Sequence, residues 1–469
     1  MPIANNSCRT WLSVQTLVCG ATVALLLAFD QKARADDAPP SVSFSKDVAP
    51  LLIKKCQACH GQQEPKGGYQ ILNYTLVLKA GESESAAITP GKPEESEVFN
   101  LISSTDESSR MPKEGDPLSA EQIALVKRWI TEGAKYDSAD PNASLASIAP
   151  KPAQPDPPQA YRRPVPITAV ALSADGQEVA VSGYHEVTIW NAATGALVRR
   201  IKNVPERVYS VAYSPDGLLL AIAGGTPGQS GEVNLFNPAE GTLSKELGSM
   251  IDVAYRAVFN PAGTKLAVGG ADRTIRIYDV ATGKQEILIE DHADWVVSLT
   301  WSPDGTRLAS ASRDKTSKLF NAANGESLMT YSGQGDQVFG VAFNGDGKLI
   351  YTAGADKKIH IWNPDDGQKK GEVAGFGREV LGLVTSADKI FSCSADKTVQ
   401  QHRDGLKHFK TYAGHTDSVF SIAYHPGTQR VATGSFSGEV RIWNAEDGAA
   451  VSTFIAAPGY VPPAPVAAK

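Results

Sequence analysis

The chain is poor in cysteine. It has five cysteines in 469 residues. Two of these, Cys8 and Cys19, fall in the N-terminal segment discussed below, Cys56 and Cys59 form a single Cys-x-x-Cys pair, and Cys393 stands alone. This count excludes a disulfide framework, and no second Cys-x-x-Cys exists to complete a tetrahedral zinc site. We expect Cys393, which lies in a strand pattern, to be a buried small hydrophobic residue.

The chain also lacks a strong charge of one sign. It carries 45 Lys and Arg against 51 Asp and Glu, for a net charge of -6, which gives no reason to expect a nucleic-acid partner. No serine-histidine-aspartate order, phosphate loop or catalytic carboxylate pair stands out. The length and the 42% of hydrophobic residues are enough for two or three ordinary globular domains.

Long apolar runs are confined to the first 35 residues. Arg9 precedes an apolar run over residues 17–29, and residues 33–35 (Ala-Arg-Ala) offer small side chains for a signal peptidase. The run is too short for a comfortable membrane span. We therefore expect residues 1–35 to be a signal peptide, with an uncleaved anchor as the alternative. The mature protein is then exported, periplasmic or elsewhere in the cell envelope, and has no membrane span.

The most informative feature present is Cys56-Gln57-Ala58-Cys59-His60. A Cys-x-x-Cys-His run is typical of covalent haem attachment. Two thiols at this spacing can add to the two vinyl groups of one haem while the adjacent imidazole faces the iron. Export agrees with this interpretation, because c-type haem is attached outside the cytoplasm in bacteria. A redox-active or zinc-binding cysteine pair is the alternative.

A second axial ligand is the next group that such an iron needs. Met111 is the only methionine between the signal and the repeats described below, and Pro112 stiffens the loop that presents it. The alternative is a core methionine that fills a gap. With His60 and Met111 both bound the iron has no open site, which favours electron transfer over catalysis. We expect His60 to use Nε2 for the iron and Nδ1 as a donor to a backbone carbonyl.

Two amphipathic helices bracket this motif. Upstream, Asp47 can cap a helix that carries Val48, Leu51 and Leu52 on one face. Downstream, residues 119–122 (Ser-Ala-Glu-Gln) form a capping box before an apolar stripe that ends at Gly133. These patterns predict a small all-α cytochrome c domain over residues 41–137.

The domain also resembles a known family. Residues 43–136 resemble the planctomycete-type c-type cytochrome domain. This resemblance implies haem c, attachment through Cys56 and Cys59, His60 as proximal ligand and Met111 as the matching methionine. One departure is Lys113, where the family commonly has a second proline. The resemblance is carried by Phe44, Asp47, Pro50, Cys56, Cys59, His60, Gly61, Gly67, Gly68, Pro90, Gly91, Pro93, Met111, Pro112, Pro117, Leu118, Trp129, Ile130, Gly133 and Ala134.

Residues 138–163 are rich in proline, which predicts a semi-rigid exposed spacer. Residues 164–457 then repeat with a period of roughly 40–46 residues, as four-stranded propeller blades do. Seven units predict an all-β seven-bladed propeller, followed by a Pro/Ala-rich tail over residues 458–469. The aromatic residue that closes each third strand recurs at Trp190, Phe236, Tyr278, Phe320, Trp362 and Trp443, with His402 in the sixth unit.

The units resemble WD-repeats. Trp190-Asn191 and Trp443-Asn444 match the Trp-Asp position, and His292 and His415 match the Gly-His position. The resemblance implies structural pairs between such histidines and the turn aspartates, which are Asp272, Asp314, Asp356 and Asp396.

Three features depart from the repeat pattern. Residues 226–230 are an insertion, which we expect to form a loop on one face. Residues 400–402 (Gln-Gln-His) replace an apolar strand end, so we expect the third strand of the sixth unit to be more exposed. Ring closure stays open, since residues 160–166 can supply a strand to the last blade or the ring can close without exchange.

A basic residue follows the turn aspartate in four units, at Arg273, Lys315, Lys357 and Lys397. One explanation is that Asp-Lys is common in such turns. The other is a ring of cations that docks an acidic partner.

The patterns together favour an exported cytochrome with one covalent haem c that carries electrons, and a propeller that docks a redox partner protein. One alternative is an enzyme that resembles the haem nitrite reductases, whose propellers have eight blades around a second haem. Another is an envelope scaffold in which the haem is structural or sensory. The electron donor and acceptor do not follow from the sequence.

Overall fold

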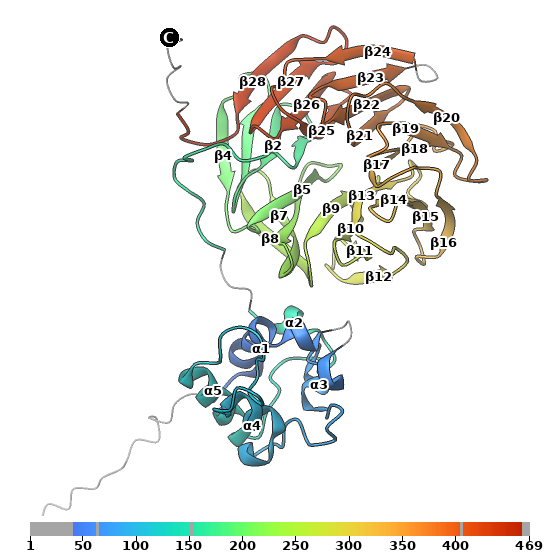
Figure 1. The fold of residues 1–469 in the computed structure, drawn as a ribbon. Helices are drawn as coiled ribbons and strands as arrows, with labels where there is room; N and C mark the ends of the chain where they lie inside the picture. Colours follow the sequence, from blue (N-terminus) through green and yellow to red (C-terminus); the bar gives the residue numbers. More distant parts are fainter. Residues whose placement is uncertain (1–40, 62–64, 151–153, 404–406, 462–469) are drawn as a thin grey trace, which may run out of the picture.

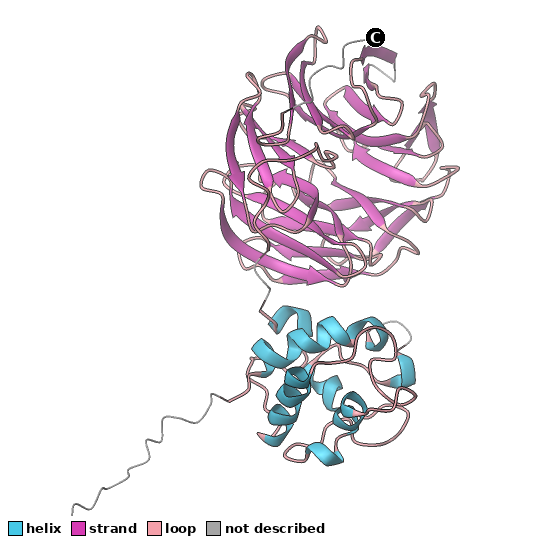
Figure 2. Ribbon diagram, turned by 60° about the vertical axis from the view of Figure 1, so that its left-hand side comes forward, coloured by secondary structure: helices cyan, strands magenta, loops and turns pink. Residues whose placement is uncertain are grey.

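The computed structural model describes residues 41–61, 65–150, 154–403 and 407–461. The predicted signal peptide and the end of the predicted tail lie outside these residues. A helical part comes first and an all-β propeller follows, which confirms the predicted multidomain fold class (Figure 1 and Figure 2).

The helical part is built from short helices joined by turns. Its elements are η1 Phe44–Val48, α1 Ala49–Lys55, α2 Gln57–His60, η2 Lys66–Gly68, α3 Tyr74–Leu78, η3 Pro93–Glu95, α4 Glu97–Ser103, α5 Ala120–Thr131 and α6 Leu145–Ile148.

The first predicted helix begins earlier than expected. Ser43, and not Asp47, is its N-cap, and the Ser43 hydroxyl accepts a hydrogen bond from the Lys46 amide. The Asp47 carboxylate reaches back and accepts from the Ser43 amide at 2.9 Å. The backbone amides of Ser43 and Lys46 thus both have acceptors. Asp47 therefore stabilises the start of the helix from inside its first turn.

Helix α5 begins as the sequence predicted. Ser119 and Gln122 form a reciprocal capping box, and the buried face of the helix includes Trp129, which is 1% exposed. Trp129 packs against Phe44 at 5.3 Å between ring centroids. The two bracketing helices thus meet across the core of the helical part.

The predicted spacer is wrong in its first stretch. Residues 142–149 contain no proline, and Leu145–Ile148 within them form a last short helix, α6, in place of exposed chain. Leu145 is 2% exposed and belongs to the core of the helical part, and its amide donates to the Leu72 carbonyl at 2.9 Å. Burial of this leucine extends the helical part to about residue 149.

The described residues of the propeller form seven four-stranded antiparallel sheets, each built from consecutive strands. In chain order the blades are β1 Val170–Leu172, β2 Glu178–Ser182, β3 Val187–Asn191, β4 Leu197–Ile201; β5 Arg207–Tyr213, β6 Leu220–Thr226, β7 Ser230–Asn237, β8 Thr242–Met250; β9 Ala254–Phe259, β10 Lys265–Gly270, β11 Ile275–Asp279, β12 Gln285–Ile289; β13 Val296–Trp301, β14 Arg307–Ser312, β15 Ser317–Asn321, β16 Ser327–Tyr331; β17 Val338–Phe343, β18 Ile350–Gly354, β19 Ile359–Trp362, β20 Lys369–Val373; β21 Val380–Ser386, β22 Lys389–Ser394, β23 Val399–Arg403, β24 Lys407–Tyr412; and β25 Val419–His425, β26 Arg430–Ser435, β27 Glu439–Asn444, β28 Ala450–Ile455.

The ring closes without strand exchange. Strands β1, β5, β9, β13, β17, β21 and β25 each contact the next, and β25 contacts β1. Residues 160–166 add no strand to the last blade. The seam is held instead by backbone hydrogen bonds, from Ile167 to the Ser435 carbonyl and from Tyr161 to the Pro458 carbonyl, both 3.0 Å.

Residues 154–161, which we name the strap, are mostly exposed, but Pro157 and Tyr161 are buried and hydrogen bonds tie the strap to the first blade. The Arg200 guanidinium donates to the Pro158 carbonyl at 2.6 Å. Tyr161 is 6% exposed, and its hydroxyl donates to Glu186 at 2.7 Å. Because Arg200 also binds Glu186, one buried ion pair fastens the strap to the first blade.

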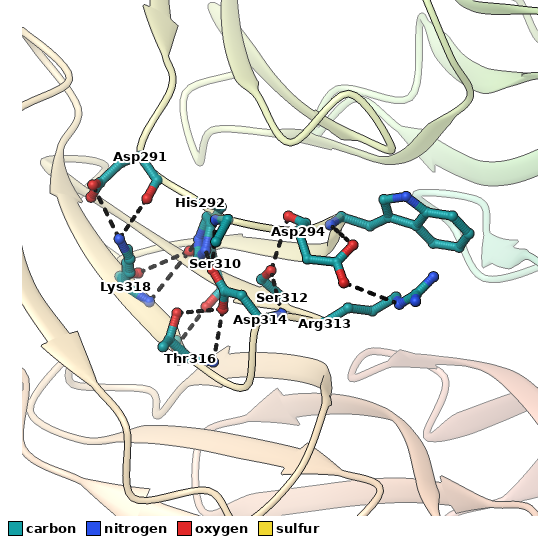
Figure 3. Close-up of polar contacts among 12 residues, drawn as sticks. Asp291, His292, Asp294, Ser310, Ser312, Arg313, Asp314, Thr316 and Lys318 are labelled. Carbon is teal, nitrogen blue, oxygen red and sulfur yellow. Dashed lines mark hydrogen bonds and ion pairs between the residues drawn. The ribbon is translucent and has the colours of Figure 1, made fainter. Parts of the chain in front are cut away.

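The histidine pair implied by the WD resemblance is present in the fourth blade. His292 Nδ1 lies 2.7 Å from the Asp314 carboxylate, and its Nε2 lies 2.7 Å from the Ser310 hydroxyl (Figure 3). Burial alone raises the pKa of Asp314, but hydrogen bonds from His292 and Thr316 outweigh it and lower that pKa. These polar groups tie the turn to its own blade.

The structure refines the expectation for the insertion and corrects that for the sixth blade. Thr226 and Ser230 pair with each other, so the insertion lengthens a β-hairpin, and residues 227–229 form the loop at its end. In the sixth blade Gln401 is 0% and His402 2% exposed, so the predicted exposure of this strand is wrong. The Gln401 amide lies 2.7 Å from the Tyr412 hydroxyl, which satisfies it inside the blade. Cys393 is fully buried, as predicted.

Candidate functional site

A cavity of about 570 Å³ lies in the helical part, and all four predicted site residues line it: Cys56, Cys59, His60 and Met111. The volume falls within the ~300–1,000 Å³ range of small-molecule and cofactor sites. Residues 55 positions apart in the chain therefore meet at one place.

Local helix geometry positions the first three residues. Cys56 ends α1, and its amide donates to the Leu52 carbonyl at 2.9 Å. The next turn, α2, follows at once, and the His60 amide donates to the Cys56 carbonyl at 3.0 Å. This single turn brings the two thiols and the imidazole to the same wall of the cavity.

The imidazole of His60 is oriented by a backbone carbonyl. Its Nδ1 lies 3.1 Å from the Tyr69 carbonyl. A carbonyl only accepts, so Nδ1 carries the proton and the neutral ring keeps a lone pair on Nε2. The His60 carbonyl in turn accepts from the Ile71 amide at 3.0 Å. The pattern matches the orientation expected of a histidine ligand.

Tyr69 was not singled out as a site residue by sequence reasoning. Its ring packs edge-on against His60 with the ring centroids 5.4 Å apart, and its hydroxyl donates to the Val77 carbonyl at 2.9 Å. The available signal was its place directly after Gly67-Gly68, two glycines with positive φ that turn the chain back toward the motif.

Met111 reaches the cavity from the loop after α4. Its amide donates to the Leu101 carbonyl at 3.0 Å, and its half-buried side chain packs against the core of the helical part. Pro112 lines the same cavity. The loop thus presents a thioether to the space that His60 faces.

The remaining wall is largely apolar. Burial, with a smaller contribution from Cys59, raises the pKa of the Cys56 thiol to about 11 despite the nearby Lys55. A redox-active Cys-x-x-Cys pair needs a lowered thiol pKa, so this environment disfavours that alternative. Apolar lining residues include Leu52, Ile71, Val98, Leu101, Ile102 and Leu118.

The zinc alternative lacks ligands. Within the described ranges, no group of three or more His, Cys, Asp or Glu side chains is arranged to hold a metal ion. Cys56 and Cys59 are free thiols. A tetrahedral site needs four donors of this kind.

Charged side chains stand at the edge of the cavity. Lys66 and Glu114 both line it and form an exposed ion pair at 3.5 Å. The pair joins the segment that carries Tyr69 to the segment that follows Met111. Being exposed, it contributes little to stability.

The residues present fit haem c. The cavity offers two thiols at the Cys-x-x-Cys spacing, an imidazole with a free Nε2, a thioether and an apolar wall. These are the groups that attach and ligate such a cofactor.

On the propeller, the four cations that follow the turn aspartates are all exposed and all have positive φ, between 63° and 74°. Lys315 lies 3.8 Å from Asp336 of the next blade. A carboxylate therefore already faces one member of the predicted cation ring. The four residues are Arg273, Lys315, Lys357 and Lys397.

No helix in the described parts of the chain has the length and apolar character needed to cross a membrane.

Comparison with known families agrees with both parts of the chain. Residues 56–115 match the family Planctomycete cytochrome C. The WD domain, G-beta repeat family matches residues 245–279, 283–321, 325–363 and 406–444. The structure shows that the parts of the propeller outside these matches also form four-stranded blades. No curated protein matches the chain. The chain therefore carries a planctomycete-type cytochrome c domain followed by a seven-bladed propeller of WD40 repeats.

Proposed function

We propose that this protein is an exported c-type cytochrome that carries electrons and uses its propeller to dock a redox partner. It holds one haem c through thioethers at Cys56 and Cys59, with His60 and Met111 as the two axial ligands. It works in the periplasm or elsewhere in the cell envelope.

The observation that carries the proposal is the meeting of these four side chains at one apolar cavity. When bound, haem c supplies a one-electron redox couple. His60 is held by Tyr69 with Nε2 free for the iron, and the thioether of Met111 raises the potential. The apolar wall excludes water, which also tunes the potential.

Two ligands from one chain favour an electron carrier over a catalyst, because they close both axial positions. The enzyme alternative, a haem nitrite reductase, implies eight blades, whereas the described residues build seven. The propeller then serves the role that WD40 repeats usually serve, which is protein interaction.

The test is production of the full chain in a bacterium that attaches haem c outside the cytoplasm. We expect the purified protein to gain the mass of one haem, to contain one iron per chain, and to show a c-type reduced spectrum. The double variant Cys56→Ala/Cys59→Ala should lose the covalent haem, while the matched control Cys393→Ala should keep it. Unmodified mass in the parent would refute the attachment.

Export and redox cycling are measured on the same preparation of the protein. The parent should be recovered from the periplasmic fraction with its first 35 residues removed, and its spectrum should change reversibly with an added reductant and oxidant. A change in the spectrum on addition of nitrite or oxygen, which reports binding at the iron, would favour the enzyme alternative. Such binding requires an open axial position.

A further inference from the structure

The second blade has longer third and fourth strands than the other blades. Strand β7 has eight residues and β8 has nine, whereas the third and fourth strands of the other described blades have four to six. Pairing between β7 and β8 continues to Glu232 with Ser249 and to Gly231 with Met250. The insertion supplies this extra length. The stacking of repeats does not require it, because the other blades stack without it.

The lengthened strand β8 contacts the helical part. It is last in the order β5-β6-β7-β8, so one of its edges has no partner strand in its own sheet. Proteins commonly cover such an edge with a helix or a loop, because its free N–H and C=O groups would otherwise pair with another chain. Helix α6 contacts β8, and Figure 1 shows the helical part beside the side of the propeller that carries this strand. Because Leu145 of α6 is buried in the helical core, this contact joins the two parts of the protein.

The strap begins on the same blade. The Gln154 side-chain amide donates to Glu232, in the lengthened part of β7, at 2.7 Å, and the Gln154 backbone amide donates to the Asn203 side chain at 3.2 Å. The Ala149 amide donates to the Leu145 carbonyl at 2.9 Å and so belongs to the end of α6. Five residue-to-residue steps separate Ala149 from Gln154, and such a stretch spans at most about 18 Å. The chain alone therefore keeps the helical part close to the second blade.

A short tether strengthens a small contact. It gives an effective concentration on the order of millimolar, at which even a weak contact is mostly formed. The contact between α6 and β8 therefore does not need a large buried area to persist.

We propose that the lengthened second blade is an intramolecular docking platform (strands β7 and β8) for the helical part, so that the two parts of the protein move as one body. The insertion has this role in place of a role in the repeat itself. The inference goes beyond the proposed electron transfer, because the contact requires no haem. For the proposed function it means that the haem cavity keeps one position relative to the propeller.

The first experiment separates a docked helical part from one that is only tethered. Ten Gly and Ser residues are inserted between Lys151 and Pro152 of the full chain, and small-angle X-ray scattering compares this protein with the parent. We expect the same radius of gyration and maximum dimension in both, because the docked helical part stays on the platform. An undocked helical part should instead raise the maximum dimension by about 15 Å, since ten such residues span roughly 17 Å on average. That result would overturn the proposal.

The second experiment tests whether β8 is the docking surface. In the protein with the inserted linker, S244R/E246R places two long cationic side chains at exposed positions of β8. We expect the maximum dimension to rise by about 15 Å, because the helical part is released to the full reach of the linker. The matched control is L328R/T330R, at the equivalent exposed positions of β16 in the fourth blade, and it should leave the dimension unchanged.

An unchanged dimension in S244R/E246R, or an equal rise in the control, would overturn the assignment of β8. Thermal unfolding of each variant is recorded, so that loss of the propeller fold is distinguished from release of the helical part. The haem content of each sample is measured as well. Release with full haem content then reports on docking alone, and a failure of haem attachment does not affect the result.

Discussion

The Nδ1 atom of His60 lies 3.1 Å from the backbone carbonyl of Tyr69, and the hydroxyl of Tyr69 in turn donates to the Val77 carbonyl at 2.9 Å. Two hydrogen bonds in series therefore fix the ring that faces the cavity. Outer partners of this kind set the orientation and basicity of a ligand histidine.

Removing the second of these bonds should affect the redox centre as well as stability. Tyr69→Phe leaves the Val77 carbonyl without this donor, which costs about 1–2 kcal/mol in the free energy of unfolding. We also expect a shift of the midpoint potential, measured by redox titration. The control is Tyr74→Phe, which removes a similar bond to the Ala134 carbonyl at 2.7 Å away from the cavity lining. An equal shift in both variants would contradict the positioning role of Tyr69.

Met111→Ala should open one axial position. We expect the oxidised protein to lose the sulfur-to-iron charge-transfer band and the midpoint potential to fall, because methionine ligation raises it. Met329→Ala, in strand β16 of the propeller, removes a methionine remote from the cavity and serves as control. An unchanged spectrum in Met111→Ala would refute the ligand assignment.

Arg200→Ala should loosen the strap. Glu186 has a fully buried side chain and is held by Arg200 at 2.5 Å, so removing the guanidinium leaves a buried carboxylate unpaired at a cost of about 3–5 kcal/mol. The adjacent Arg199→Ala removes a more exposed pair with Glu178 and should cost roughly 1–2 kcal/mol. Urea unfolding measures both. Faster proteolysis within residues 154–161 should accompany only the first, and equal losses would argue against the buried pair.

His415 predicts a dependence of stability on pH. Burial, with a smaller effect of Arg441, lowers its pKa from the ordinary 6.5 to about 4. Between these values the unfolded chain binds a proton that the folded chain does not, so stability falls as pH falls from 6.5 to 4, by up to roughly 1.4 kcal/mol per pH unit.

His415→Gln should flatten that part of the pH profile. Glutamine is a suitable replacement because Gln334 takes the equivalent place in the fifth blade and accepts from the Thr352 hydroxyl at 2.9 Å. His415 contacts Thr433 in the same way at 2.8 Å. Urea unfolding at pH 7 and pH 5 measures the difference, with the exposed His408→Gln as control. Equal flattening in the control would rule out burial of His415 as the cause.

Local patterns in the sequence were enough to single out four residues that line one cavity and to predict the number of blades. The Cys-x-x-Cys-His run, the isolated Met111 and the capping box at Ser119 each depend on residues close in the chain. Met111 and His60 line the same cavity, which agrees with these local patterns. Turn chemistry and the closing aromatics predicted the seven blades, because a repeat reveals its strands by recurrence.

What the sequence did not reveal depends on distant partners. The strap was interpreted as an exposed spacer because it is rich in proline, and most of it is exposed, yet Tyr161 is buried and its hydroxyl donates to Glu186, 25 positions away. Gln401 was expected at the surface because its hydrogen-bond partner belongs to no local pattern: the hydroxyl of Tyr412, on the next strand, contacts its side-chain amide.

Ring closure without strand exchange has an evolutionary consequence. Each blade is complete within one continuous stretch of chain, so a gene segment for one blade can be duplicated or lost without rethreading its neighbours. The seam between the last and first blades, where Ile167 bonds to Ser435, is the one junction that such an event must preserve. A propeller of this kind can therefore change its number of blades more easily than one whose last blade combines strands from both ends of the chain.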